Sequence, residues 1–299
     1  MACARQKSIY LTDGIKEIFK NSGFKPKKSL GQNFLTDGDI AGRIAELAEI
    51  TPDDHIIEVG PGVCALTETL CAKARRVIAV EIDRRLVPII NAKMLRYGNF
   101  NLINADALSV SADLLFGGAS ADIPKKNVKF ISNMPYNIST QLMTRLFTEF
   151  TGVGKAVLTM QREVADKILA PPSTAEYNAV TVFADSFAKA SRAFMIPQHC
   201  FTPQPRIDSA VVVFDARDEA AAAAPYGGTF VAVVRAAFAN RRKTLENCLL
   251  HAGLAPDRPS AANALAQAGL PRIARGESLS CAQFETLAKI LHSKYLYRN

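Results

Sequence analysis

The stretch Ile56-Ile57-Glu58-Val59-Gly60-Pro61-Gly62 is the part of the chain from which we interpret the rest. Its apolar half is typical of a strand buried in a sheet, and the glycines after it allow a tight turn toward the start of a helix. Such a turn lets the backbone approach a bound ligand closely. The full Gly-x-Gly-x-x-Gly pattern of dinucleotide-binding proteins is missing, and Pro61 makes the turn a poorer cradle for a pyrophosphate. The stretch therefore indicates a nucleoside site at the end of a first strand.

Short apolar runs alternate with helical patterns along the next part of the chain. Further strands are expected at residues 77–80, 101–103, 128–131, 156–160 and 210–214, with helices at 65–72, 86–95 and 140–150 between them. This alternation predicts an α/β fold with a doubly wound parallel sheet. Beyond about residue 220 the pattern is purely helical, over residues 230–239, 245–251, 261–267 and 281–291. We therefore expect a basic N-terminal arm at 1–28 around a short helix, an α/β domain at 29–219 and an all-helical domain at 220–299.

Composition and charge limit the class of protein. The chain has 299 residues, of which 48% are hydrophobic and 21% charged, which is typical of a globular protein. Its apolar runs are shorter than the roughly 18 residues of a membrane span, and its start lacks the apolar core of a signal peptide, so we expect a cytoplasmic protein. Six cysteines (Cys3, Cys64, Cys71, Cys200, Cys248, Cys281) form no Cys-x-x-Cys pair, which argues against a metal site or a disulfide framework.

The excess of positive charge is concentrated in two clusters. The formal net charge is +8, and basic residues gather at Lys25, Lys27 and Lys28 and again at Arg241-Arg242-Lys243. Such clusters commonly bind the phosphates of a nucleic acid. The alternative is a solvated charged face or, for the second cluster, helix capping with interdomain salt bridges to the acidic strand ends, and both uses are compatible.

Acidic residues end the next two expected strands. Glu81 closes the second strand, where a carboxylate can accept hydrogen bonds from both hydroxyls of a ribose. Asp106 follows the third strand and is placed to contact an adenine amino group. Because the carboxyl ends of parallel strands meet at one edge of a sheet, these residues and Gly60 and Gly62 are expected to surround a single nucleoside cofactor.

Asn133-Met134-Pro135-Tyr136 follows the fourth expected strand and suits a flat base that bears an amino group. The Asn133 side-chain oxygen and a backbone carbonyl beside Pro135 can accept hydrogen bonds from one exocyclic amino group. Pro135 stiffens this presentation because its φ is fixed. Tyr136 offers a ring face for stacking, an interaction worth about 1–3 kcal/mol per base. Together these residues indicate methylation of an adenine amino nitrogen.

These segments, with four others, resemble the KsgA/RsmA family of 16S ribosomal RNA adenine dimethyltransferases. The additional matches are 28–35 (Lys-Ser-Leu-Gly-Gln-Asn-Phe-Leu), 161–164, 201–211 and 238–247, the last of which contains Phe-x-x-Arg-Arg-Lys-Thr. The resemblance runs from Pro26 to the last helix. It implies a Rossmann-like class I methyltransferase sheet with a small C-terminal all-helical domain, and S-adenosylmethionine as the methyl donor. Departures are small: Cys64 stands where the family often has Gly or Ala, and Met134 replaces Leu.

The resemblance also implies roles for individual residues. Asn33 and Leu35 would line the methionine end of the donor with Gln32 nearby, Gly60 would contact the donor, Glu81 its ribose and Asp106 its adenine. Asn133 would mark the methyl-transfer centre. Tyr136 and Phe201 would sandwich the target adenine after it leaves its stack, although Phe201 is equally suited to a core position. Lys27, Lys28, Arg241, Arg242 and Lys243 would bind RNA phosphates. No metal and no covalent nucleophile is required.

The leading hypothesis is an enzyme that dimethylates two adjacent adenosines near the 3′ end of 16S RNA within a 30S precursor. Three alternatives stay open: a 23S RNA methyltransferase of the erythromycin-resistance type, a DNA adenine methyltransferase, and a catalytically silent RNA-binding assembly factor. The Phe-x-x-Arg-Arg-Lys-Thr segment favours the leading hypothesis. A monomer is expected. The sequence leaves undecided whether free RNA or a particle is the substrate, in what order methyl groups are added, and what the 170–180 loop does.

Overall fold

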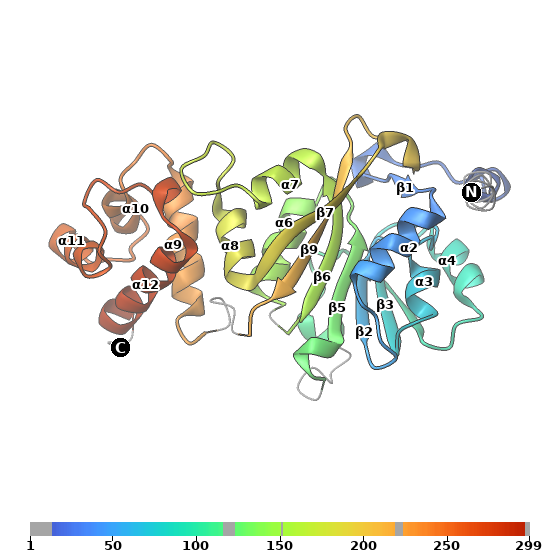
Figure 1. The fold of residues 1–299 in the computed structure, drawn as a ribbon, viewed down its shortest axis with the longest axis horizontal. Helices are drawn as coiled ribbons and strands as arrows, with labels where there is room; N and C mark the ends of the chain where they lie inside the picture. The colour runs from blue at the N-terminus through green and yellow to red at the C-terminus, as the bar shows by residue number, and fades with distance from the viewer. Residues whose placement is uncertain (1–13, 116–122, 151, 219–223, 297–299) are drawn as a thin grey trace. The chain divides into compact units, whose positions relative to one another are not determined.

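A seven-stranded sheet organises the chain in the computed structural model, which describes residues 14–115, 123–150, 152–218 and 224–296. The strand order is β4-β3-β2-β5-β6-β9-β7 (Figure 1). The strands are β2 (His55–Val59), β3 (Arg76–Glu81), β4 (Phe100–Asn104), β5 (Val128–Asn133), β6 (Lys155–Gln161), β7 (Ala188–Ile196) and β9 (Ser209–Ala216). A separate two-stranded sheet pairs β1 (Phe34–Leu35) with β8 (Phe201–Thr202).

The direction of the strands fixes where a ligand site can form. β2 pairs in parallel with both β3 and β5, β3 with β4, and β5 with β6, whereas β9 runs antiparallel to β6. From β2 the strand order continues through β3 to β4 at one edge of the sheet. The next strand, β5, lies on the other side of β2. A reversal of this kind leaves a crevice at the carboxyl ends of the strands, and here it falls between β2 and β5.

Helices connect and follow the strands (Figure 1). Residues 14–22 are helical. The α-helices are α2 (Gly38–Leu47), α3 (Thr67–Cys71), α4 (Val87–Met94), α5 (Ala112–Leu115), α6 (Ser139–Thr148), α7 (Arg162–Ile168), α8 (Ala179–Phe187), α9 (Gly227–Ala239), α10 (Leu245–His251), α11 (Arg258–Gln267) and α12 (Cys281–Leu291). Short 3₁₀ turns are η1 (Lys28–Leu30), η2 (Lys125–Asn127), η3 (Gln198–Cys200) and η5 (Gly276–Ser278), and η6 (His292–Leu296) is a π-helix.

By its internal contacts the chain divides into two compact units. The first unit contains Met1–Leu142, Gly152–Ala165 and Ser191–Asp215, and the second contains Met143–Thr151, Asp166–Ala190 and Ala216–Asn299. The second unit thus includes two segments that precede residue 220, so the division by contacts differs from the expected domain boundary. That boundary stays a prediction about domains, and residues 219–223 of the expected linker lie outside the described residues.

Apolar side chains hold each unit together. In the first unit, Ile44 of α2 and Leu70 of α3 are fully buried in one cluster with Ile131 and Val157 of the sheet. A cluster of buried aliphatic side chains of this kind is the main source of stability for an α/β unit. In the second unit, aromatic rings pack between helices: Phe183 against Phe230, and Phe238 against Phe284.

The strands expected from the apolar runs are confirmed, and so are the helices of the last eighty residues. The sequence analysis missed β7 because its residues, Ala-Lys-Ala-Ser-Arg-Ala-Phe-Met-Ile, form no apolar run and most of them are at least partly exposed. It lies at the edge of the sheet, where only one side of a strand is paired. The expected N-terminal arm is described only from residue 14, and Cys3 lies outside the described residues.

The structure also assigns a role to the segment before α8. Tyr177 is buried and its hydroxyl donates to the Leu279 carbonyl at 2.7 Å, while Asn178 caps α8 through the Val180 N–H. The segment therefore anchors α8 to the approach to α12 within the second unit. Among the described helices, none has the length and apolar character needed to cross a membrane.

Candidate active site

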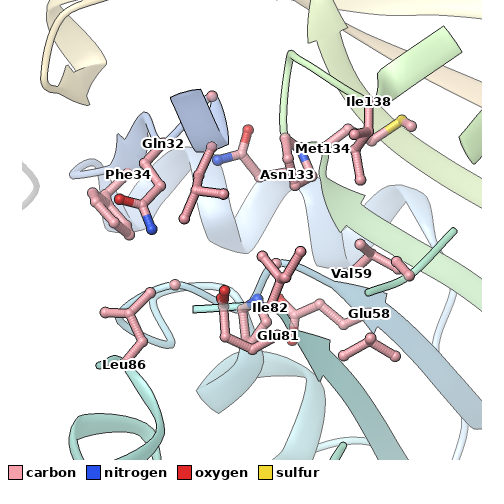
Figure 2. Close-up of a pocket in the computed structure, with 18 of the residues that line it drawn as sticks. Gln32, Phe34, Glu58, Val59, Glu81, Ile82, Leu86, Asn133, Met134 and Ile138 are labelled. Carbon is pink, nitrogen blue, oxygen red and sulfur yellow. The ribbon is translucent and has the colours of Figure 1, made fainter. Parts of the chain in front are cut away.

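A cavity of about 240 Å³ opens at the crevice between β2 and β5 (Figure 2). The ends of β2, β3 and β5, the loop after β4 and the segment from Leu30 to Leu35 line it. In Figure 2, Gln32 and Asn133 lie on one side of the cavity and face Glu58, Glu81 and Ile82 on the other. The structure brings nine of the expected site residues together in its wall: Gln32, Asn33, Leu35, Gly60, Gly62, Glu81, Asp106, Asn133 and Pro135.

The glycine turn after β2 needs both of its glycines. Gly60 has φ 73°, and a Cβ at that position would lie 3.1 Å from Cγ of Pro135. Gly62 has φ 57°, and a Cβ there would lie 2.7 Å from the ring of Phe34. Both positions thus combine a left-handed backbone with a close neighbour, which only glycine accommodates. The turn is shaped by its contacts with the segment after β5 and with β1.

Cys64 occupies the third left-handed position of this turn. Its φ is 64° and its side chain is fully buried. A side chain at positive φ costs about 1–2 kcal/mol, which accounts physically for the glycine that the resembling family often has at this position. Burial raises the pKa of the Cys64 thiol to about 12, so the thiol is neutral and unreactive.

Two buried carboxyl groups face the cavity from β2 and β3. Burial raises the pKa of Glu81 to about 7, although Glu81 accepts a hydrogen bond from the Asp83 N–H at 2.8 Å. Burial likewise raises the pKa of Glu58 to about 8, and the nearby Glu81 carboxyl adds to this shift. Oε2 of Glu58 is buried without a hydrogen-bond partner. The cavity therefore holds two acidic groups close to neutrality, and cations or hydroxyl donors would stabilise their charged forms.

Asn133 presents an unpaired oxygen at the carboxyl end of β5. Its Nδ2 donates to the Asn33 carbonyl at 3.1 Å, which fixes the orientation of the amide. Its Oδ1 is buried and has no partner. A buried acceptor without a donor costs about 1–3 kcal/mol, so this oxygen is suited to a ligand that brings an N–H group.

The residues after Asn133 complete a rigid loop. The Pro135 carbonyl already accepts a hydrogen bond from the Ile138 N–H at 3.2 Å. The described backbone hydrogen bond of Met134 uses its N–H, which donates to the Thr159 carbonyl. The backbone carbonyl beside Pro135 that remains for a ligand is therefore that of Met134. Gly31 packs on this loop so closely that a Cβ there would lie 2.6 Å from Oδ1 of Asn137. The segments 28–35 and 133–139 thus support each other.

Tyr136 belongs to this loop but does not line the cavity. The ring is half-buried, and its hydroxyl forms a 2.5 Å hydrogen bond with the Ser209 hydroxyl at the start of β9. Burial raises the pKa of Tyr136 to about 12, so the phenol is neutral. A ring that is held by its hydroxyl and partly exposed is suited to stacking rather than to proton transfer.

Phe201 does not lie where the expected stacking role would place it. It is 2% exposed, pairs with Leu35 in the β1–β8 sheet and belongs to the apolar cluster of the first unit. Its ring is therefore not available to a base in this structure, and the core position that the sequence analysis had weighed is the one observed. The reason is that strand pairing with β1 turns the ring into the core.

The basic residues fall into two kinds. Lys27, Lys28, Arg242 and Lys243 are exposed. Arg241 instead forms an ion pair with Glu277 at 3.1 Å and donates to the carbonyls of Thr174 and Ala175. Arg241 thus fastens the loop before α8 within the second unit, a structural role that differs from the expected salt bridges to the acidic strand ends, because its partner Glu277 lies in the same unit.

Sequence reasoning missed three groups next to the cavity: Glu58, Asp83 and Arg85. Glu58 lies inside the quoted strand, and only its burial beside Glu81 reveals it. Asp83 is 5% exposed and accepts hydrogen bonds from Gln32 and Arg85. An acidic residue two positions after a strand carries no signal of its own, because one of its partners, Gln32, lies 51 positions earlier in the chain.

The described residues contain no group of three or more His, Cys, Asp or Glu side chains that could hold a metal ion. The cavity itself offers unpaired acceptors, a glycine turn and two buried carboxyl groups. These features fit a nucleoside-type methyl donor: Glu81 can accept from ribose hydroxyls, Gly60 leaves room beside Pro135, and Oε2 of Glu58 can face a positive charge.

Comparison with known proteins agrees with this geometry. The family model "Ribosomal RNA adenine dimethylase" matches residues 23–291. A ribosomal RNA small subunit methyltransferase A of Bacillus pumilus is 38% identical over 279 residues, covering 92% of this chain and 94% of the relative. The protein of the same name from Pelotomaculum thermopropionicum is 40% identical over 278 residues, with the same coverage of 92% and 94%.

Solved structures share the fold. A dimethyladenosine transferase from Plasmodium falciparum superposes with a TM-score of 0.68 at 23% identity, covering 83% of this chain and 94% of that one. The 23S rRNA methyltransferase ErmE superposes with a TM-score of 0.60 at 27% identity, covering 87% and 99%. The expected Rossmann-like methyltransferase fold and the expected resemblance are therefore confirmed. The chain belongs to the ribosomal RNA adenine dimethylase family, and it is a methyltransferase that uses S-adenosylmethionine.

Proposed function

We propose that this protein dimethylates N6 of two adjacent adenosines near the 3′ end of 16S ribosomal RNA, within a precursor of the small ribosomal subunit. The observation that carries the proposal is the buried, unpaired Oδ1 of Asn133, which lies in the wall of the cavity beside the glycine turn. The identity of 38–40% to small-subunit methyltransferases supports the choice of RNA. The cytoplasm as its location and a monomeric state belong to the same proposal.

Residues of the cavity wall would hold the methyl donor. We assign the ribose to Glu81, the adenine to Asp106, and the methionine end to Asn33 and Leu35 with Gln32 nearby. Gly60 and Gly62 would keep the turn in place beside the donor, because the absence of a side chain lets the turn pack against Pro135 and Phe34. The donor, when bound, supplies an electrophilic methyl group on a positively charged sulfur.

The loop after β5 would activate the adenine. The amino nitrogen is a poor nucleophile because its lone pair is delocalised into the ring. Oδ1 of Asn133 and the Met134 carbonyl can accept its two hydrogens, which stabilises the positive charge that develops on nitrogen during attack. Pro135 holds these two acceptors in a fixed relation, and Tyr136 stacks on the base. Positioning and electrostatic stabilisation together account for catalysis without a proton-transferring side chain.

Exposed lysines and arginines would bind the RNA backbone. Arg242 and Lys243 in the second unit, and Lys27 and Lys28 in the first, are free to approach phosphates. Replacing Arg242 and Lys243 together by Gln should weaken binding to the particle and reduce its salt dependence by up to about two units of slope. Arg241→Gln is the contrasting variant, because this side chain holds the loop before α8 and its loss should lower stability. If the salt dependence of particle binding is unchanged in the double variant, Arg242 and Lys243 have only a structural role.

A 23S RNA substrate is the second candidate, because the ErmE structure is similar over 87% of this chain. The identity to that protein is 27%, against 38–40% to the small-subunit enzymes.

A methyl-transfer assay with radiolabelled S-adenosylmethionine separates the two candidate functions. Unmethylated 30S particles, 50S precursors and DNA are supplied in parallel. We expect label in two adjacent adenosines of 16S RNA; label in 23S RNA alone would favour the second candidate. Tight binding to 30S particles without label would indicate a silent assembly factor.

A further inference from the structure

A polar network lies beside the donor cavity, and its members belong to the first unit. The Asp83 carboxylate is 5% exposed and accepts from Nε2 of Gln32 at 2.9 Å and from Nε of Arg85 at 2.9 Å. A second guanidinium nitrogen of Arg85 contacts the other carboxylate oxygen at 2.5 Å. Arg85 therefore grips Asp83 with two parallel hydrogen bonds, the geometry in which an arginine–carboxylate pair is most directional.

This network joins the wall of the cavity to the segment that precedes it. Gln32 lines the cavity, and its Oε1 accepts from the Lys27 N–H at 2.7 Å. Arg85 donates to the Lys25 carbonyl at 3.2 Å, and its guanidinium lies 4.7 Å from the centre of the Phe24 ring. The segment 24–32 is thus held at both of its ends, by Arg85 at one and by Asp83 through Gln32 at the other.

The same network reaches the expected ribose acceptor. The Asp83 backbone N–H donates to Oε1 of Glu81 at 2.8 Å. Arg85 and Gln32 hold the pKa of Asp83 down at about 2, so this carboxylate is charged at neutral pH. Asp83 therefore links two residues of the cavity: its backbone N–H donates to Glu81, and its carboxylate accepts from Gln32.

We infer that Asp83 and Arg85 are positioning residues for the methyl donor, which act by holding Gln32 and the segment 24–32 in place against the cavity. The inference rests on the proposed function, because it assigns the cavity to S-adenosylmethionine. Neither side chain lines the cavity, so their effect on the donor is transmitted through Gln32 and Glu81. A network with this role affects donor binding and leaves the methyl-transfer step alone.

The chain offers a matched pair of variants. Arg85→Gln removes the grip on Asp83 and one positive charge. Arg84→Gln removes the same charge from the neighbouring residue, whose exposed side chain makes none of the described contacts. Because both variants change the overall charge equally, a difference between them cannot come from general attraction to RNA. Arg85 has an exposed side chain, so its loss is compatible with folding, which the melting temperature checks.

S-adenosylhomocysteine is the probe, titrated calorimetrically into the full chain of the wild type and of each variant. We expect Arg85→Gln to raise Kd by about tenfold, because the donor loses the equivalent of one well-placed hydrogen bond when Gln32 is no longer held in position. Arg84→Gln should leave Kd for S-adenosylhomocysteine unchanged. In the methyl-transfer assay Arg85→Gln should raise KM for S-adenosylmethionine while kcat stays within about twofold.

The single variant Gln32→Ala and the double variant Gln32→Ala with Arg85→Gln are titrated in the same way. The double variant should bind S-adenosylhomocysteine no more weakly than whichever single variant binds it less tightly, because both side chains act through one contact. Equal affinity of the Arg85→Gln and Arg84→Gln proteins, or strictly additive losses in the double variant, would overturn the inference. Absence of binding by the wild type would contradict the proposed function itself, whereas binding by the wild type without a difference between the variants would contradict only this inference.

Discussion

Buried polar groups are paired at one end of the central sheet and lack partners at the other. At the end where the parallel strands begin, Lys129 and Asp54 form an ion pair at 2.8 Å with side chains that are 7% and 2% exposed, and Lys129 also donates to the Glu49 carbonyl. Lys155 contacts both Glu49 and Asp215 nearby. Charges at this end are therefore paired.

At the carboxyl end of the same strands, buried acceptors are left unpaired. Among the described residues, the buried side-chain atoms without a partner are Glu58 Oε2, Thr67 Oγ1, Asn133 Oδ1 and Thr159 Oγ1. Asn133 and Thr159 face each other in the register of β5 and β6, and Glu58 lies one residue from the end of β2. Unpaired groups are costly, so their concentration at one end indicates that this end is organised for a ligand and the other for stability.

The largest effect is expected from breaking the buried ion pair. Lys129→Met leaves the Asp54 carboxylate buried without its partner and should lower the free energy of unfolding by about 3–5 kcal/mol. Lys155→Met is the control, because its partner carboxylates are 76% and 61% exposed, and it should cost less than about 1 kcal/mol. Urea denaturation of both variants measures the difference. Equal losses would show that pairing at this end does not depend on burial.

The next effect concerns the stacking ring at the ligand end. Tyr136→Ala should reduce kcat/KM for the RNA particle by the equivalent of about 1–3 kcal/mol, because the target base loses its stacking partner. Tyr136→Phe keeps the ring and loses only the hydrogen bond to Ser209, so its effect should not exceed about 1 kcal/mol. Steady-state kinetics with unmethylated particles test this. Equal losses in the two variants would assign the importance of Tyr136 to its hydroxyl.

A smaller effect is expected from pH. The pKa of Glu81 is about 7 in the free protein, so raising the pH from 6 to 8 converts most of this group from the acid to the carboxylate. Only the carboxylate accepts from both ribose hydroxyls, so donor binding should tighten with rising pH, by up to about tenfold over that range. Calorimetric titration with S-adenosylhomocysteine at several pH values gives the profile. Glu81→Gln should bind more weakly and show a flatter profile; an unchanged slope would assign the titration to another group.

The smallest effect concerns Cys64, a buried residue with a left-handed backbone. Cys64→Gly relieves the left-handed strain and loses a small buried side chain, so the free energy of unfolding should change by less than about 1 kcal/mol. Cys64→Val should destabilise by more than 1 kcal/mol, because a β-branched residue tolerates positive φ poorly. Thermal denaturation ranks the variants. A valine variant as stable as the wild type would show that the turn can relax.

The sequence predicted the ligand end of the sheet far better than its other end. Gly60, Glu81 and Asn133 follow strands in a parallel sheet, and the rule that such ends converge was enough to group them. Lys129 and Asp54 carried no comparable signal, because their pairing depends on burial that no local pattern reveals. The same reason hid Asp83 and Glu58. It also left Phe201 undecided between stacking and the core, because its position follows from its pairing with a two-residue strand. β7 was missed because an edge strand with mixed exposure lacks the apolar run that marks a central one.

The central claim is that the unpaired Oδ1 of Asn133 serves the chemical step, and single-turnover methyl transfer by Asn133→Ala tests it most directly. Donor affinity, particle affinity and the free energy of unfolding are measured on the same protein. The account predicts a rate lower by about 10²–10³, the usual loss when one stabilising polar group is removed. Both affinities should stay within a few-fold, and the free energy of unfolding should fall by no more than about 1 kcal/mol, from the lost hydrogen bond to the Asn33 carbonyl. A rate close to that of the wild type would contradict it.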